Sequence, residues 1–322
     1  MYEKHENISQ SELKLFEKEG PEYFYEKKYI KKDIYDDEPS AEAQYFTDGK
    51  VIHTLLLEKE LFDSRYKVVD FDIPEGKLSE FVYLKKAYIL SGLTEEESNI
   101  KAKEKCELKY TIDRILSETS KSQYKDYSDA LDAYGMDISL VSKTTYGNAL
   151  NILNKINDNK LAVELLRNSD DSNNYYEYEI FADINISNIL FGAKGKLDKL
   201  KVFKNTNKAI IIDIKTTYSI PQFKYLYRKF KYYRQLQYYK MLLEADLFNK
   251  EFKSYDIEAY IIALENTPRG LNKVFKISQE DLNKGLAEIE EIVPRLNWHI
   301  VNNIWVDKDN YEGNPTILNI NE

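Results

Sequence analysis

The chain contains Gly195-Lys196-Leu197-Asp198 and, fifteen residues after that aspartate, Asp213-Ile214-Lys215. We expect two strands here, residues 194–203 and 208–217, joined by a turn. The register of that hairpin places Asp198 directly opposite Asp213. Two like charges opposed on one face of a sheet are destabilising unless something neutralises them. A divalent cation between the two carboxylates would do so.

Side chains alternate along a strand, so Lys215 shares a face with Asp213, while Ile214 leaves its backbone carbonyl near the same edge. Magnesium and manganese ions take oxygen ligands of this kind. Such a cation activates a water molecule, and a neighbouring lysine offsets the charge that develops on an attacked phosphate. The pattern therefore indicates hydrolysis of a phosphodiester bond, with Mg²⁺ or Mn²⁺ as the cofactor.

This arrangement resembles the active-site core of the PD-(D/E)XK nucleases, in which one acidic residue on a strand is followed by an acidic-x-lysine triplet on the next. Asp213-Ile214-Lys215 supplies the triplet, and the apolar run at residues 209–212 predicts a strand buried on both faces. The alternative at this stage is a structural salt bridge at the end of a core strand. The resemblance implies that Asp198, Asp213 and the Ile214 carbonyl bind metal and that Lys215 is catalytic.

A third acidic side chain comes from the strand predicted at residues 175–184, which carries Glu177 and Glu179 on one face. If a loop centred on Ser187 and Asn188 joins this strand to the next, Glu177 lies opposite Asp198. A different loop would bring Glu179 there, and surface strands also carry glutamates for solubility alone. We predict Glu177 as a catalytic and metal-binding residue, with Glu179 left open.

His53 lies on the apolar face of a helix expected at residues 41–62, where a buried structural histidine is the simpler interpretation. However, Gly49-Lys50-Val51-Ile52-His53 resembles the Gly-x-x-x-His motif of the RecB-like and exonuclease VIII-like (RecE-type) nucleases. In that motif the glycine allows another backbone to approach. The resemblance implies that His53 is catalytic and binds the metal or the scissile phosphate.

A basic helix is predicted at residues 222–247, and the stretch from Ile214 to Leu243, which includes most of it, contains no acidic residue. Gln235 and Tyr239 share one face of it, and this Gln-x-x-x-Tyr pair again resembles the same nucleases. A tyrosine-rich core helix with a solvated lysine face is the alternative. The residues predicted to bind DNA are Gln235, Tyr239, Lys231, Arg234 and Arg228.

Composition limits the other function classes. The 322 residues carry a net charge of −9 and a single cysteine, Cys106, which excludes an internal disulfide and a cysteine-based zinc or iron–sulfur site. No apolar run approaches the roughly 20 residues that span a bilayer, and residues 1–6 do not resemble a signal peptide. We therefore expect a cytoplasmic protein without membrane association. A phosphate-binding Gly-x-x-x-x-Gly-Lys loop is also absent.

The remaining segments predict further elements. Ser9 and Glu12 form a capping box for a short helix that should stop at Gly20-Pro21. We expect residues 78–167 to be mainly helical, with breaks near Gly92, Gly135 and Gly147. Two strands should follow the basic helix, at residues 255–264 and 273–277. A closing helix is expected at residues 278–293, where Pro294 interrupts it.

The predicted fold is α/β: a restriction-endonuclease-like (PD-(D/E)XK) core with a central mixed sheet flanked by helices and a helical N-terminal region. We expect one nuclease domain over residues 1–322, mainly helical to residue 168, with the catalytic sheet and basic helix at 169–300 and a tail at 301–322.

The resemblance implies a magnesium-dependent deoxyribonuclease, specifically a 5′–3′ exonuclease on double-stranded DNA ends in phage-type recombination. It also implies a homo-oligomer and a single-strand annealing protein as partner. The alternatives are a structure-specific endonuclease, an inactive DNA-binding protein with a nuclease-like fold, and a hydrolase of small phosphate esters.

Overall fold

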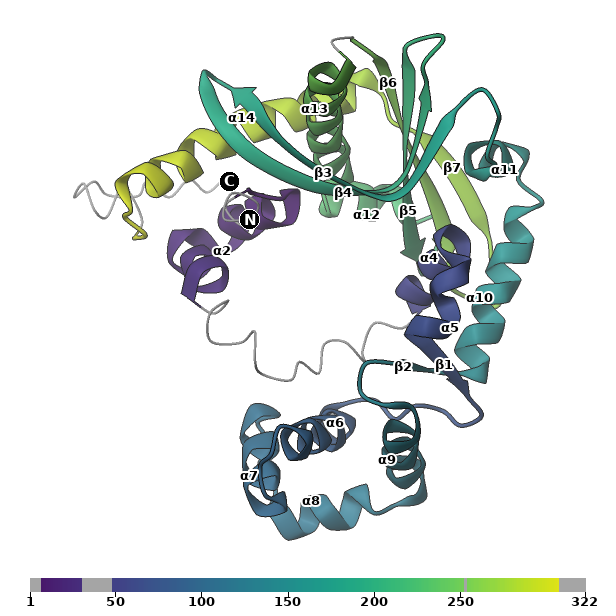
Figure 1. Cartoon of the computed structure of the whole chain (residues 1–322), viewed down its shortest axis with the longest axis vertical. Coiled ribbons are helices and arrows are strands. Elements are labelled where there is room, and N and C mark those ends of the chain that lie inside the picture. Colours follow the sequence, from purple (N-terminus) through teal and green to yellow (C-terminus); the bar gives the residue numbers. More distant parts are fainter. Residues whose placement is uncertain (1–6, 31–47, 252–253, 307–322) are drawn as a thin grey trace.

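The computed structural model describes residues 7–30, 48–251 and 254–306, and its centre is a mixed five-stranded sheet flanked by helices (Figure 1). The strand order is β3-β4-β5-β6-β7. Strands β5 and β6 are parallel, and the other neighbours are antiparallel. The bounds are β3 Asn173–Ile186, β4 Ile189–Phe203, β5 Lys208–Thr217, β6 Asp256–Glu265 and β7 Asn272–Lys276.

Both predicted hairpin registers are present. Ser187 and Asn188, with φ of 50° and 66°, form a two-residue turn between β3 and β4, the left-handed geometry that matches the twist of a hairpin. The ladder between β4 and β5 runs from the pair Phe203–Lys208 at the turn to the pair Lys199–Ile212. It stops one step before Asp198 and Asp213, and the two strands part at that point.

Helices cover the two faces of the sheet and bury a separate apolar cluster on each (Figure 1). Ile211 belongs to one cluster and Ile212 to the other, so β5 is buried on both faces as predicted. The first cluster packs against α2 (Gln10–Tyr25), α13 (Tyr232–Glu251) and α14 (Gln279–Asn302). The second packs against α4 (Asp48–Leu57), α10 (Lys143–Ile156) and α11 (Lys160–Leu166).

The N-terminal segment joins the sheet directly. Ile8 forms a parallel bridge to Ala193 of β4, on the edge of β4 that β5 leaves free. Ser9 and Glu12 then form the predicted capping box. The helical geometry breaks at Gly20, where φ is 84°, as predicted, and a second helical segment then completes α2 to Tyr25. Glycine accepts that left-handed backbone without a Cβ clash.

A helical unit built from α6, α7, α8 and α9 has its own apolar core around Phe81, Ile115 and Tyr127, and lies below the sheet in Figure 1. A parallel pair, β1 with β2, leads into and out of it. This pair was not predicted, and the break expected at Gly147 is wrong because Gly147 lies inside α10. The bounds are α6 Lys77–Leu90, α7 Glu95–Lys105, α8 Ile112–Thr119, α9 Ser122–Tyr134, β1 Tyr66–Val69 and β2 Ser139–Ser142.

Two other helix predictions need correction. The basic stretch forms two helices, α12 (Phe223–Lys229) and α13, because Lys231 adopts a left-handed φ of 54° between them. Helix α14 runs through Pro294 to Asn302. The short elements are η1 Glu26–Ile30, η3 Lys59–Leu61 and α5 Phe62–Arg65. The predicted helix at residues 41–62 begins outside the described residues. Within them it is α4, which ends at Leu57, five residues before the predicted end.

Within residues 7–30, 48–251 and 254–306, none of the helices combines the length and apolar character that crossing a bilayer requires.

Arg234 anchors α13 to the neighbouring helices. Its side chain is 0% exposed, and Nη1 lies 2.8 Å from Glu17 Oε2 of α2 and 3.4 Å from Glu288 Oε2 of α14. A buried charge is tolerated only when it is paired. This ion cluster therefore fixes how three helices meet on one face of the sheet.

We predict that Arg234→Met lowers the free energy of unfolding by about 1–3 kcal/mol, because Glu17 and Glu288 lose their buried partner and are left paired with Lys231. The matched control is Arg228→Met, since Arg228 is exposed on α12 and should change stability by no more than about 0.5 kcal/mol. Urea unfolding of both variants measures the difference. Equal stabilities would contradict the anchoring role.

Two buried lysines close the end of α11. Lys199 Nζ donates to the carbonyl of Leu166, and Lys201 Nζ donates to the carbonyls of Glu164 and Arg167. The last carbonyls of a helix lack partners within the helix, so these ammonium groups satisfy them. Burial, and secondarily the charge of Lys201, lowers the pKa of Lys199 to about 8.

Between pH 8 and 10 the unfolded chain thus binds more protons at Lys199 than the folded chain, and this lysine makes stability rise with pH. We predict that Lys199→Met removes that rise, on the order of 1–2 kcal/mol. Urea unfolding at several pH values across this window tests it, with the exposed Lys160→Met as control. Parallel stability curves for wild type and Lys199→Met would show the prediction to be wrong.

Candidate metal and active site

The site forms where β4 and β5 part, between α4 and α13. The N–H of Ile214 donates to Asp198 Oδ2 at 2.6 Å, in place of a backbone carbonyl on β4. A buried N–H must find an acceptor, and here the acceptor is a carboxylate. This hydrogen bond fixes the Asp198 side chain at the opening between the strands.

Three of the predicted metal ligands gather around that carboxylate. His53 of α4, Glu177 of β3 and Asp198 of β4 each offer one ligand atom, and these atoms all lie within 4.8 Å of one another. His53 Nδ1 lies 3.8 Å from Asp198 Oδ2. In the part of the chain that the structure describes, no other group of three histidine, cysteine or acidic side chains meets this spacing. The donor set of one imidazole and two carboxylates suits a divalent cation.

Glu177 enters the cluster through an irregularity in β3. Its φ is 47°, and the β3–β4 register passes from Tyr176 to Tyr178 without pairing it. A non-glycine residue with a left-handed backbone inside a strand is strained, and such strain is concentrated at functional sites. Glu179, the residue left open by the sequence, is exposed and stays in register opposite Lys196. The structure therefore brings Glu177, and not Glu179, to the other ligands.

Asp213 and Lys215 form the adjoining half of the site. Lys215 Nζ lies 2.9 Å from Oδ1 and 2.7 Å from Oδ2 of Asp213, as expected for two residues on one face of β5. Asp213 is almost fully buried. Burial alone would lower the pKa of Lys215, but the charges of Asp213 and Asp198 outweigh it and raise that pKa. Lys215 is therefore held in its charged form.

The remaining charges of the site are poorly balanced. Burial, and then the charge of Asp213, raises the pKa of Asp198 to about 7. Burial, and then the charge of Lys215, lowers the pKa of His53. Crowded carboxylates beside a neutral imidazole are the surroundings that a bound cation stabilises. The residues present thus fit a divalent metal ion.

Gln235 and Tyr239 of α13 line the other side of the site. Gln235 Nε2 donates to the Tyr239 hydroxyl at 3.0 Å. Burial, and then the charge of Asp213, raises the pKa of Tyr239 to about 12. Gly195 makes this approach of α13 to β4 feasible, since a Cβ there would lie 2.8 Å from Leu242 and 3.1 Å from the Tyr239 ring.

Gly49 differs in detail from what the resemblance implied. A Cβ at Gly49 would lie 3.3 Å from Oγ1 of Thr216, so the close neighbour of this glycine is a side chain of β5, where another backbone was expected. The effect on the site is similar. The first turn of α4 can sit against β5, and His53, one turn later, reaches Asp198.

The predicted DNA-binding residues separate into three groups. Gln235 and Tyr239 lie at the site, and Arg228 is exposed on α12. Lys231 is half-buried and paired with Glu17 and Glu288. The prediction for Arg234 is wrong, because its side chain is fully buried in the ion cluster with these same glutamates. A basic run in a sequence does not distinguish an exposed cation from a buried one.

Sequence reasoning assigned no role to two residues beside the site. Lys196 Nζ lies 2.7 Å from Glu177 Oε2, and the ring centroid of Tyr232 lies 5.2 Å from Lys215 Nζ. Lys196 shares a face of β4 with Asp198, so strand alternation could have found it. Tyr232 depends on the break before α13, which carries no signal in the sequence.

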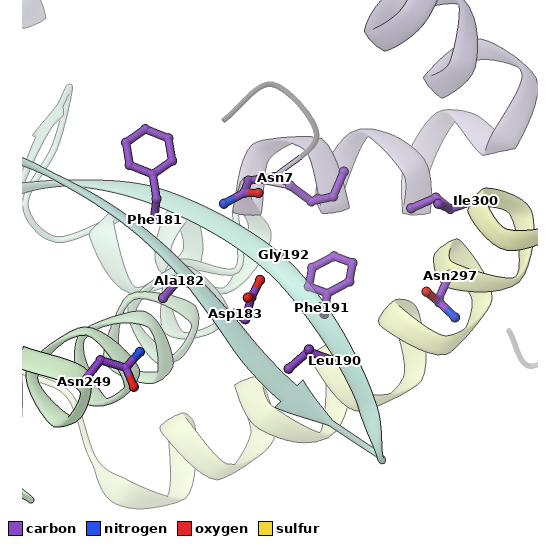
Figure 2. A pocket seen from close by; sticks show the side chains of 11 residues that line it. Asn7, Phe181, Ala182, Asp183, Leu190, Phe191, Gly192, Asn249, Asn297 and Ile300 are labelled. Atoms are coloured by element: carbon purple, nitrogen blue, oxygen red, sulfur yellow. The ribbon is translucent and has the colours of Figure 1, made fainter. Parts of the chain in front are cut away.

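A hollow of about 680 Å³ lies away from this site, at the turn of β3 and β4 (Figure 2). Phe181 and Asp183 of β3, Leu190 of β4, Asn249 of α13 and Asn297 of α14 are among the residues that line it. None of its lining residues belongs to the metal cluster. The candidate chemistry is therefore not in this hollow.

No protein-family model matches the chain, and no curated protein matches it. Among solved structures, the chain is similar to a candidate exonuclease from Eubacterium rectale, with 13% identity and a TM-score of 0.48 over 98% of this chain and 90% of that one. It is also similar to the protein SSO0001, with 17% identity and a TM-score of 0.26 over 77% of this chain and 89% of that one.

Proposed function

We propose that this protein is a metal-dependent nuclease that hydrolyses phosphodiester bonds of DNA. The observation that supports the proposal is the convergence of His53, Glu177 and Asp198 within 4.8 Å beside the Asp213–Lys215 pair. The motif order and this geometry both favour a restriction-endonuclease-like core of the PD-(D/E)XK type.

Each side chain has a role in this proposal. His53, Glu177 and Asp198 hold the metal ion, and Asp213 with the Ile214 carbonyl completes its surroundings. A bound Mg²⁺ or Mn²⁺ supplies an activated water and offsets phosphate charge. Lys215 stabilises the negative charge that develops on the attacked phosphate, because its ammonium is already fixed and desolvated. Gln235 and Tyr239 position the DNA backbone beside it.

The finer activity follows the resemblance. We propose an exonuclease on double-stranded DNA ends with 5′–3′ polarity, acting in phage-type recombination as a homo-oligomer with a single-strand annealing protein. A structure-specific endonuclease is the second candidate, since the site chemistry is the same for both. Digestion of linear but not closed circular duplex supports the exonuclease, and cleavage of the circle supports the endonuclease.

We predict that wild-type protein releases nucleotides from a linear duplex labelled at one 5′ end in magnesium but not in EDTA. Lys215→Ala should reduce the rate by about 10²- to 10³-fold, because a fixed charge is lost from the transition state. Asp213→Asn should also be strongly impaired. Circular dichroism checks that both variants fold, and full cleavage by either folded variant would overturn the assignment.

We predict a sharp contrast between two glutamates on β3. Glu177→Gln should lower cleavage by at least about 10-fold and raise the magnesium concentration needed for half-maximal rate, because one ligand charge is lost. Glu179→Gln removes the same charge two residues away and should leave both quantities unchanged. Magnesium titrations of cleavage measure this contrast, and equal effects would assign the losses to overall charge.

A further inference from the structure

Three aromatic rings lead away from the catalytic lysine, and we call Tyr232, Phe230 and Tyr225 the aromatic strip. Lys215 Nζ lies 5.2 Å from the Tyr232 ring centroid, and the centroids of Tyr232 and Phe230 are 5.8 Å apart. Lys229 Nζ lies 5.7 Å from the Phe230 centroid and 5.8 Å from that of Tyr225. The strip is therefore continuous from the site to α12.

The outer part of the strip faces solvent. Tyr225 is 64% exposed and Phe230 is 36% exposed. Tyr218, three residues beyond Lys215, is 85% exposed, and three extended residues span at most about 10 Å. Single exposed aromatics are ordinary on protein surfaces. Here the exposed rings of Tyr225 and Phe230 belong to a series of contacts that reaches the catalytic lysine through Tyr232, which itself packs against the core and stacks on Phe223.

The cations beside the strip are available to a ligand. Lys224, Arg228 and Lys229 are exposed. Within the part of the chain that the structure describes none of them forms an ion pair with an acidic side chain, and Lys229 lies over the Tyr225 and Phe230 rings. Lys231, between α12 and α13, is instead neutralised by Glu17 and Glu288. A polyanion that contacts these three side chains releases counterions and gains affinity, even on a protein of net charge −9.

Rings interleaved with unpaired cations are the surface that binds single-stranded nucleic acid, because unpaired bases offer free faces for stacking and phosphates follow the cations. The stacked bases of an intact duplex do not offer these faces. Resting on the nuclease function proposed above, we infer that the aromatic strip binds the unpaired strand of the DNA substrate. Bases stack on Tyr225 and Phe230, and Arg228 and Lys229 contact the phosphates.

The test measures, by fluorescence anisotropy, the binding of a labelled oligothymidylate of about 12 nucleotides to the full chain. The buffer contains EDTA, so that no cleavage occurs. Tyr225→Ala should weaken binding about 5- to 100-fold, the effect of losing one stacked base. Tyr225→Phe keeps the ring and should stay within about twofold of wild type on the same stacking argument. Tyr110→Ala is the matched control, since Tyr110 is 47% exposed and also carries a cation, Arg114, over its ring at 4.2 Å.

A second ligand separates stacking from charge. An abasic oligonucleotide of equal length has the phosphates but no bases, so its affinity should not change with Tyr225→Ala. The double variant Arg228→Ala with Lys229→Ala should weaken both ligands and reduce the slope of log affinity against log salt by about 1.4. Unchanged binding of oligothymidylate to Tyr225→Ala, or equal losses with Tyr110→Ala, overturns the inference.

The same variants distinguish this inference from the proposed function. Magnesium-dependent cleavage by wild type together with binding that does not depend on Tyr225 would overturn the aromatic strip and leave the nuclease intact. Binding that depends on Tyr225 without any cleavage would support the strip and overturn the nuclease.

Discussion

The hydrogen bond from the Ile214 N–H to the Asp198 carboxylate is the interaction on which the site depends. This bond ends the β4–β5 ladder, because an N–H that donates to a side chain is not available to donate to a backbone carbonyl of the neighbouring strand. The gap gives His53 and Glu177 access to the same carboxylate. Several acidic groups then share a desolvated space with a fixed ammonium. Such an arrangement costs free energy without a cation, which is a reason to regard it as functional and not structural.

Much of this geometry could be predicted from the sequence because it is local. A hairpin register follows from the turn position, so the position of Glu177 relative to Asp198 required only the correct turn at Ser187 and Asn188. Alternation along β5 placed Asp213 and Lys215 on one face. The left-handed backbone at Glu177 was not visible in the pattern, although it is the irregularity at which this side chain joins the cluster.

The errors have a common physical origin in tertiary packing. Pro294 should end a helix at a cost of about 3 kcal/mol, yet α14 continues because Val293 and Leu296 on either side of it are buried in the core. The break before α13 occurs without glycine or proline, at Lys231, whose side chain is paired with two other helices. Arg234 was expected at the surface because it is charged, but its ion pairs with Glu17 and Glu288 allow it to be buried. The parallel pair β1–β2 joins segments distant in sequence, which local patterns do not encode.

The bridge between Ile8 and Ala193 determines how late the N-terminal segment can dock during synthesis of the chain. Ile8 also accepts a hydrogen bond from the hydroxyl of Tyr238, so its partners are synthesised long after it. During translation the N-terminal helix must wait, undocked, until most of the catalytic sheet has left the ribosome. Contacts of such long sequence separation slow folding. A proteolytic fragment that lacks this segment would have an open edge on β4, which could pair with another chain.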